Sequence, residues 1–189
     1  MEEKIIITNN TKTLDNKEQY RMIENLVAKG SSLLLVGLNE EDLVHFSKRF
    51  KVTGIDTNEE LVNEYSNKGF NVKVQNVLDI NEESKYDLIW IAGSLLSLSD
   101  QEILSAVKNL KRALTTRGFI FVSHLYKFNE QNLNNRDEVN YIDEFKMDRL
   151  AKDASLNLVE YKMQIVNDEN DRAKERWLNI VFEKLNRNI

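Results

Sequence analysis

The chain has 189 residues and a mass of 22.1 kDa, a length typical of one domain, and its 41% hydrophobic residues supply enough apolar side chain for a sizeable core. Its 26 basic and 31 acidic residues give a net charge of −5, and no basic stripe interleaved with aromatic residues is present, which disfavours nucleic-acid binding. There is no cysteine, which excludes disulfides, zinc–thiolate sites and cysteine nucleophiles.

The start of the sequence, "MEEKIIITNN", lacks the long apolar segment of a signal peptide. No apolar run approaches the roughly 20 residues that a membrane-spanning helix needs. We therefore expect a cytoplasmic protein with no membrane segment. No linker-like composition interrupts the chain, so we expect one domain over residues 1–189.

Apolar runs suited to strands alternate with segments of helical spacing along the chain. The run "SLLLV" is continuously apolar, which predicts a strand buried on both faces. In chain order the predicted elements are a helix at 17–29, a strand at 32–36, a helix at about 43–50, a strand at 51–56, a helix at 57–68, strands at 70–75 and 86–92, a helix at 99–114 and a strand at 118–123.

Capping signals mark two of these helix starts, Thr57 with Glu60 and Ser99 with Glu102. A polar stretch at 127–140 precedes a last helix near 143–154. Two alternating segments, "LNLVEYKMQIV" and "RWLNIVFEK", predict an antiparallel pair at the sheet edge. The repeated alternation of strand and helix predicts a parallel sheet with helices on both faces.

Two stretches, "VTGIDTNEELV" and "YDLIWIAGSLLSLSDQEILSAVKNLKRALTTRGFIFVS", resemble the class I S-adenosylmethionine-dependent methyltransferases, and the likeness covers roughly residues 18–185. It implies a Rossmann-like α/β fold. The sheet would be doubly wound, seven-stranded and mostly parallel, with a C-terminal antiparallel edge hairpin. It also implies S-adenosylmethionine as cofactor, held at the carboxyl ends of the first strands, and a small-molecule methyl acceptor.

The resemblance assigns the cofactor contacts residue by residue. Asp56 ends the second strand 19 positions after Gly37, close to the spacing at which a carboxylate reaches a ribose. The acid that often follows the family's third strand aligns with Val77. Asp79, two residues later, could take its place, and backbone groups of Val77 and Leu78 could also contact the adenine. The implied contacts are Gly37, Asp56, Thr57, Val77, Leu78 and Ala92.

The first loop, "LLLVGLNEED", departs from the family pattern of one acid and three glycines. Those positions are Leu35, Gly37, Asn39 and Glu41, so only Gly37 is retained. Asn39 fits the cap of a structural helix, and the acids at 40–42 are interpreted as its solvated start rather than a cation site. Added side chains and acids near the cofactor's carboxylate leave two hypotheses open, an enzyme with an atypical loop or a non-catalytic relative that serves as a binding or scaffolding partner.

His124, just after the fifth strand, is the one catalytic candidate, because a neutral imidazole can take a proton from a methyl acceptor. A hydrogen-bonded structural histidine is the alternative. No metal site is predicted. The residues before 17 and the polar segment at 127–140 would cover an acceptor or form a protein-partner surface, and an oligomer stays open.

Overall fold

The computed structural model describes residues 7–11, 16–126, 139–167 and 173–185. The polar segment and the amino-terminal residues that we expected to cover an acceptor lie largely outside these ranges. The strands are β1 (Ile7–Thr11), β2 (Ser32–Val36), β3 (Lys51–Asp56), β4 (Val72–Val74), β5 (Tyr86–Ala92), β6 (Leu114–Leu125), β7 (Leu156–Asn167) and β8 (Ala173–Lys184). The helices are α1 (Lys17–Glu24), α2 (Glu40–Ser47), α3 (Glu59–Asn67), α4 (Asp100–Ala113) and α5 (Glu144–Ala154), with a 3-10 turn η1 (Val77–Asp79).

The strands form one sheet in the order β1-β7-β8-β6-β5-β2-β3-β4. Strands β2 to β6 are parallel, and β8 runs antiparallel between β6 and β7. The predicted mostly parallel sheet with a reversed final strand is confirmed. Strand β1 adds to the outer edge of β7 in parallel, which the sequence analysis did not predict because "ITNNT" has no apolar alternation.

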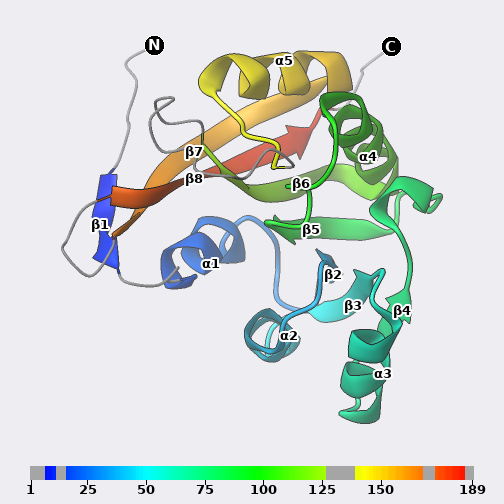
Figure 1. Cartoon of the computed structure of the whole chain (residues 1–189). Coiled ribbons are helices and arrows are strands. Elements are labelled where there is room, and N and C mark those ends of the chain that lie inside the picture. Colours follow the sequence, from blue (N-terminus) through cyan, green and yellow to red (C-terminus); the bar gives the residue numbers. More distant parts are fainter. Residues whose placement is uncertain (1–6, 12–15, 127–138, 168–172, 186–189) are drawn as a thin grey trace.

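Helices cover both faces of the sheet, with α4 and α5 on one side and α1 and α2 on the other (Figure 1). Successive side chains of a strand point to opposite faces. In β2, Leu34 and Val36 therefore join the core beneath α4 and α5, while Leu33 and Leu35 join the core against α1, α2 and α3. The expected burial of β2 on both faces is confirmed.

Helix ends differ from the prediction at α1, α2 and α3, and α2 spans Glu40–Ser47 rather than about 43–50. Helix α1 ends at Glu24, several residues before Gly30. Asn58, not Thr57, caps α3, because the Asp56 carboxylate accepts the Asn58 N–H and the Asn58 side chain then accepts from two N–H groups in the first turn. The capping box of Ser99 and Glu102 on α4 is confirmed.

The chain reverses its direction of winding at β2 and β5. These strands are neighbours, with β3 beyond β2 and β6 beyond β5. In open sheets of this kind, ligands bind outside the carboxyl ends of the strands at such a point. The fold therefore directs the search for a site to the residues that follow β2, β3, β5 and β6. Among the described residues, no helix is both long and apolar enough to cross a membrane.

Candidate functional site

The structure gathers the predicted cofactor residues at one edge of the sheet. Gly37 follows β2, Asp56 ends β3 and Ala92 ends β5, and β2 pairs with both of the other strands. Thr57 is exposed directly after Asp56, and Val77 with Leu78 forms the η1 turn after β4. His124 lies in β6, two strands away from Gly37, so it belongs to a separate part of this edge.

Asp56 is half-buried, and its carboxylate accepts two backbone hydrogen bonds. One oxygen accepts from the N–H of Leu38 and the other from the N–H of Asn58, each at 2.9 Å. Each carboxylate oxygen can accept a further hydrogen bond. Asp56 therefore holds the first loop in place and still has acceptor capacity for a pair of ribose hydroxyls.

Gly37 is held in a tight turn against the segment that follows β5. Its φ of +82° favours glycine, and a Cβ atom there would lie 1.9 Å from the Ser94 Oγ. Ser94 donates that hydroxyl to the Val36 carbonyl at 2.7 Å. The structural reason for glycine at this position is thus the contact with Ser94, and protein atoms already occupy the space that its missing side chain leaves.

The polar side chains at the start of α2 form hydrogen bonds with one another and with neighbouring elements. Asn39 caps the helix by accepting from the Asp42 N–H, as predicted. The prediction of a solvated acidic start is wrong for Asp42, which has no exposed surface and accepts from Tyr20, Trp90 and the Asn39 amide. Burial and the hydrogen bond to Asp42 raise the pKa of Tyr20 above its usual value, so its hydroxyl stays a donor.

The remaining acids of this helix, Glu40 and Glu41, are exposed, and Glu40 pairs with Lys68 at 3.2 Å. Within the described ranges, no group of three or more acidic or histidine side chains is placed to hold a metal ion.

The η1 turn offers apolar surface, and the backbone groups of Leu78 are already paired. Val77 is buried. The Leu78 N–H donates to the Asn76 side chain, and the Leu78 carbonyl accepts from Asn109, both at 2.9 Å. Hydrogen bonding of an adenine edge to the Leu78 backbone would therefore compete with protein contacts, while the half-buried Leu78 side chain can pack on a ring.

The residues present fit the nucleoside part of S-adenosylmethionine. Asp56 would supply carboxylate oxygens for the ribose, and Leu78 and Ala92 would supply small or apolar side chains at the same edge of the sheet. The chain departs from the family at the methionine part, where Asn39 replaces a glycine and Ser94 packs on Gly37. The residues present therefore fit the nucleoside half of S-adenosylmethionine, whereas the loop that would contact the methionine half is altered.

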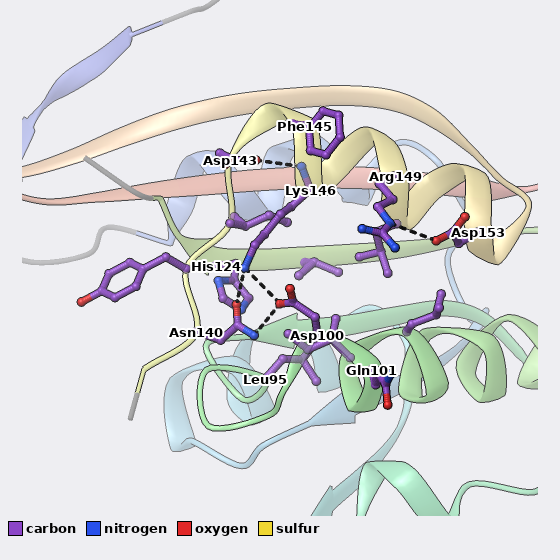
Figure 2. A pocket seen from close by; sticks show the side chains of 16 residues that line it. Leu95, Asp100, Gln101, His124, Asn140, Asp143, Phe145, Lys146, Arg149 and Asp153 are labelled. Carbon is purple, nitrogen blue, oxygen red and sulfur yellow. Dashed lines mark hydrogen bonds and ion pairs between the residues drawn. The ribbon is translucent and has the colours of Figure 1, made fainter. Parts of the chain in front are cut away.

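A cavity of about 440 Å³ lies between α4 and α5 at the carboxyl end of β6 (Figure 2). We call it the α4–α5 cavity. His124 faces it and is 2% exposed. Its Nδ1 lies 3.2 Å from the Leu125 carbonyl oxygen, and its Nε2 has no hydrogen-bond partner in the described part of the chain. Burial lowers the pKa of His124 below its usual value, which keeps the imidazole neutral.

Charged and polar residues at one end of the cavity are joined to one another, as the dashed lines in Figure 2 show. Asp100 on α4 accepts from Asn140 at 2.8 Å and from Lys146 on α5 at 3.0 Å. These two hydrogen bonds lower the pKa of Asp100. The sequence analysis missed this cluster because more than one element contributes to it and no local spacing links its members.

Comparisons with solved structures identify the fold. A methyltransferase from Methanosarcina mazei shares 17% identity and a TM-score of 0.72, with 88% of this chain and 98% of that chain covered. The Burkholderia thailandensis 1,6-didemethyltoxoflavin-N1-methyltransferase, solved with 1,6-didemethyltoxoflavin and S-adenosylhomocysteine, shares 17% identity and a TM-score of 0.72, covering 90% and 78%. A methyltransferase in complex with the Haloferax volcanii Trm112 activator shares 12% identity and a TM-score of 0.68, covering 86% of each chain.

At these identities the likeness shows the fold alone, and no curated protein matches the chain. Family membership comes from the sequence itself. The family model described as "AdoMet dependent proline di-methyltransferase" matches residues 21–169, the greater part of the chain. The resemblance expected from the sequence is confirmed, and the chain belongs to this family of S-adenosylmethionine-dependent methyltransferases.

Proposed function

We propose that this protein transfers a methyl group from S-adenosylmethionine to a small molecule bound in the α4–α5 cavity. The observation that carries the proposal is His124, a buried neutral imidazole with an unpaired Nε2 at the wall of a cavity of small-molecule size. His124 lies near the carboxyl end of β6, at the edge of the sheet that also carries Asp56. A neutral imidazole there can take a proton from an acceptor O–H or N–H.

Each predicted binding residue has a defined part in this proposal. Asp56 would hold the ribose hydroxyls, while Leu78 and Ala92 would line the nucleoside and Thr57 would lie at its exposed side. Gly37 would bring the backbone of the first loop close to the methionine part. When bound, S-adenosylmethionine supplies a methyl group on a sulfonium centre, and transfer then depends mainly on the alignment of the acceptor.

The first experiment is a calorimetric titration with S-adenosylhomocysteine. We expect saturable binding that is weaker than micromolar, since the nucleoside contacts are present and the methionine contacts are altered. The second is incubation with S-adenosylmethionine labelled in the methyl group and a deproteinised extract of small molecules. The unsubstituted protein should transfer the label to a component of the extract, and His124→Phe should transfer much less. If the unsubstituted protein transfers no label at any cofactor concentration, the enzymatic proposal is contradicted.

A second candidate function is a non-catalytic relative that acts as a binding or scaffolding partner. The specific observation in its favour is that protein contacts already occupy the first loop. Ser94 packs on Gly37, and Asn39 forms hydrogen bonds with Asp42. Such a protein keeps the fold and the cavity but gives no heat with millimolar S-adenosylhomocysteine. That result from a folded, monodisperse sample would select the second candidate over the first.

A further inference from the structure

We infer that the α4–α5 cavity takes an uncharged, mostly apolar ring molecule that donates one hydrogen bond to the Nε2 of His124. The inference names the acceptor class of the proposed methyltransferase, and in that sense it rests on the proposed function. Occupation of the cavity itself is tested without cofactor, so the two can fail separately.

The hydrogen-bonding role of His124 follows from its neighbour. The Leu125 carbonyl oxygen can only accept, so the His124 Nδ1 at 3.2 Å carries the proton. The Nε2 of the neutral ring is then an acceptor. Because it is buried and unpartnered within the described ranges, it is an unmet acceptor that a ligand N–H or O–H would satisfy.

The side chains that line the cavity favour a ligand that is mostly apolar. Its volume of about 440 Å³ lies within the range of small-molecule sites. Apolar side chains from α4, β6, α5 and the segments after β5 and before α5 line it, namely Leu95, Ile103, Leu104, Val122, Ile142 and Leu150. A molecule of one or two fused rings would bury its faces against these side chains.

The charged residues around the cavity argue against a charged ligand. Asp100 and Lys146 are paired with each other, and Arg149 is paired with Asp153 at 3.5 Å. Asp143 accepts the Lys146 N–H as the cap of α5. Each charged side chain at the cavity therefore has a protein partner, so the cavity offers no buried, unpaired charge that would select an ion of either sign.

The test compares probes that match in shape. Indole carries an N–H where benzofuran carries a ring oxygen, so the pair isolates the hydrogen bond to His124. Titrations of the unsubstituted protein followed by NMR should give indole at least tenfold higher affinity than benzofuran. Likewise, 3-propylindole should bind at least tenfold more tightly than tryptamine, which has the same side-chain length but ends in an ammonium group.

The two histidines of the chain make a spectroscopic test simple. His45 lies outside the cavity, paired with Glu24 and stacked on Tyr20, so His45→Gln leaves His124 as the single imidazole signal. In this variant the Nε2 resonance should shift much more on saturation with indole than with benzofuran, because only indole donates a hydrogen bond to it. His45→Gln should bind indole as the unsubstituted protein does, whereas His124→Phe should bind both probes with equal affinity.

Equal affinities of indole and benzofuran for the unsubstituted protein would overturn the inference, and so would an Nε2 resonance that does not move at indole saturation. Neither measurement depends on the folding of a His124 variant. Indole binding together with failed titration of S-adenosylhomocysteine would retain the cavity assignment and remove the methyltransferase proposal.

Discussion

Trp90 on β5 donates its indole N–H to the Asp42 carboxylate on α2 at 2.8 Å, and both side chains are buried. Tyr20 on α1 donates to the same carboxylate. A single acid therefore joins a strand and two helices directly beneath the first loop. This contact fixes the start of α2 in the place where related proteins carry glycines.

Asp42→Ala should lower the free energy of unfolding by about 3 kcal/mol, because the buried Trp90 and Tyr20 donors lose their acceptor. Urea unfolding followed by tryptophan fluorescence would measure the loss. Glu41→Ala, at the exposed neighbouring position, is the matched control and should change stability by less than about 0.5 kcal/mol. Similar losses in both variants would show that the Asp42 contacts do not carry this stability.

Gly37→Ala should destabilise the protein more than Gly69→Ala. Both glycines have positive φ, but a Cβ at Gly69 meets nothing within 4 Å while one at Gly37 meets Ser94. We expect about 1 kcal/mol at Gly69 from backbone strain alone and about 2 kcal/mol more at Gly37 from the clash. In a double-mutant cycle, Ser94→Gly should reduce the extra loss of stability that Gly37→Ala causes. If the effects of the two substitutions on stability are additive, the proposed contact between Gly37 and Ser94 is excluded.

Asp56→Ala should weaken S-adenosylhomocysteine binding at least tenfold, or about 1.4 kcal/mol. The variant should also lose about 1–2 kcal/mol of stability, because the N–H groups of Leu38 and Asn58 lose their acceptor. Glu83→Ala removes an exposed carboxylate just before β5 and should affect neither quantity. Calorimetry and thermal unfolding measure the two effects, and unchanged affinity would remove Asp56 from the site.

Replacing Asn39 and Glu41 by glycine should improve S-adenosylhomocysteine binding if the first loop is what limits it. The change removes two side chains and one negative charge. Glu41→Gly costs roughly 1 kcal/mol as a glycine within the helix, and Asn39→Gly removes the side chain that caps α2. The matched control replaces Ser99 and Gln101 by glycine, the equivalent cap and second helical position of α4. The control should lose a similar amount of stability and gain no affinity for S-adenosylhomocysteine. If the variant at Asn39 and Glu41 folds but binds no more tightly than the unsubstituted protein, the non-catalytic candidate is favoured.

Stability should fall as the pH drops below about 6.5, in part through His124. Burial lowers the folded-state pKa of His124 below the usual histidine value of about 6.5, so below that pH the unfolded chain binds a proton that the folded chain does not. His124 causes no further loss of stability once the pH has fallen below its folded-state pKa. Urea unfolding at a series of pH values should show a shallower decline for His124→Phe than for His45→Gln, and parallel curves would contradict this assignment.

The alternation of strands and helices and the local capping signals were sufficient to predict the fold, because periodicity and helix caps depend on residues close in sequence. Ser99 with Glu102 and the buried run of β2 are examples. The position of Asp56 at a strand end was predicted in the same way. Strand β1 escaped prediction because its polar residues gain their place only by pairing with β7.

Only the tertiary structure decided the roles of side chains whose partners lie far along the chain. The sequence identified Asp42 as part of an acidic helix start, but Trp90, 48 positions away, determines that it is buried. Lys146 and Asp100, 46 positions apart, likewise meet only when α5 packs beside α4. The sequence by itself therefore determined the fold and the strand end at which Asp56 lies, whereas the cavity beside His124 depended on long-range packing, which no local pattern records.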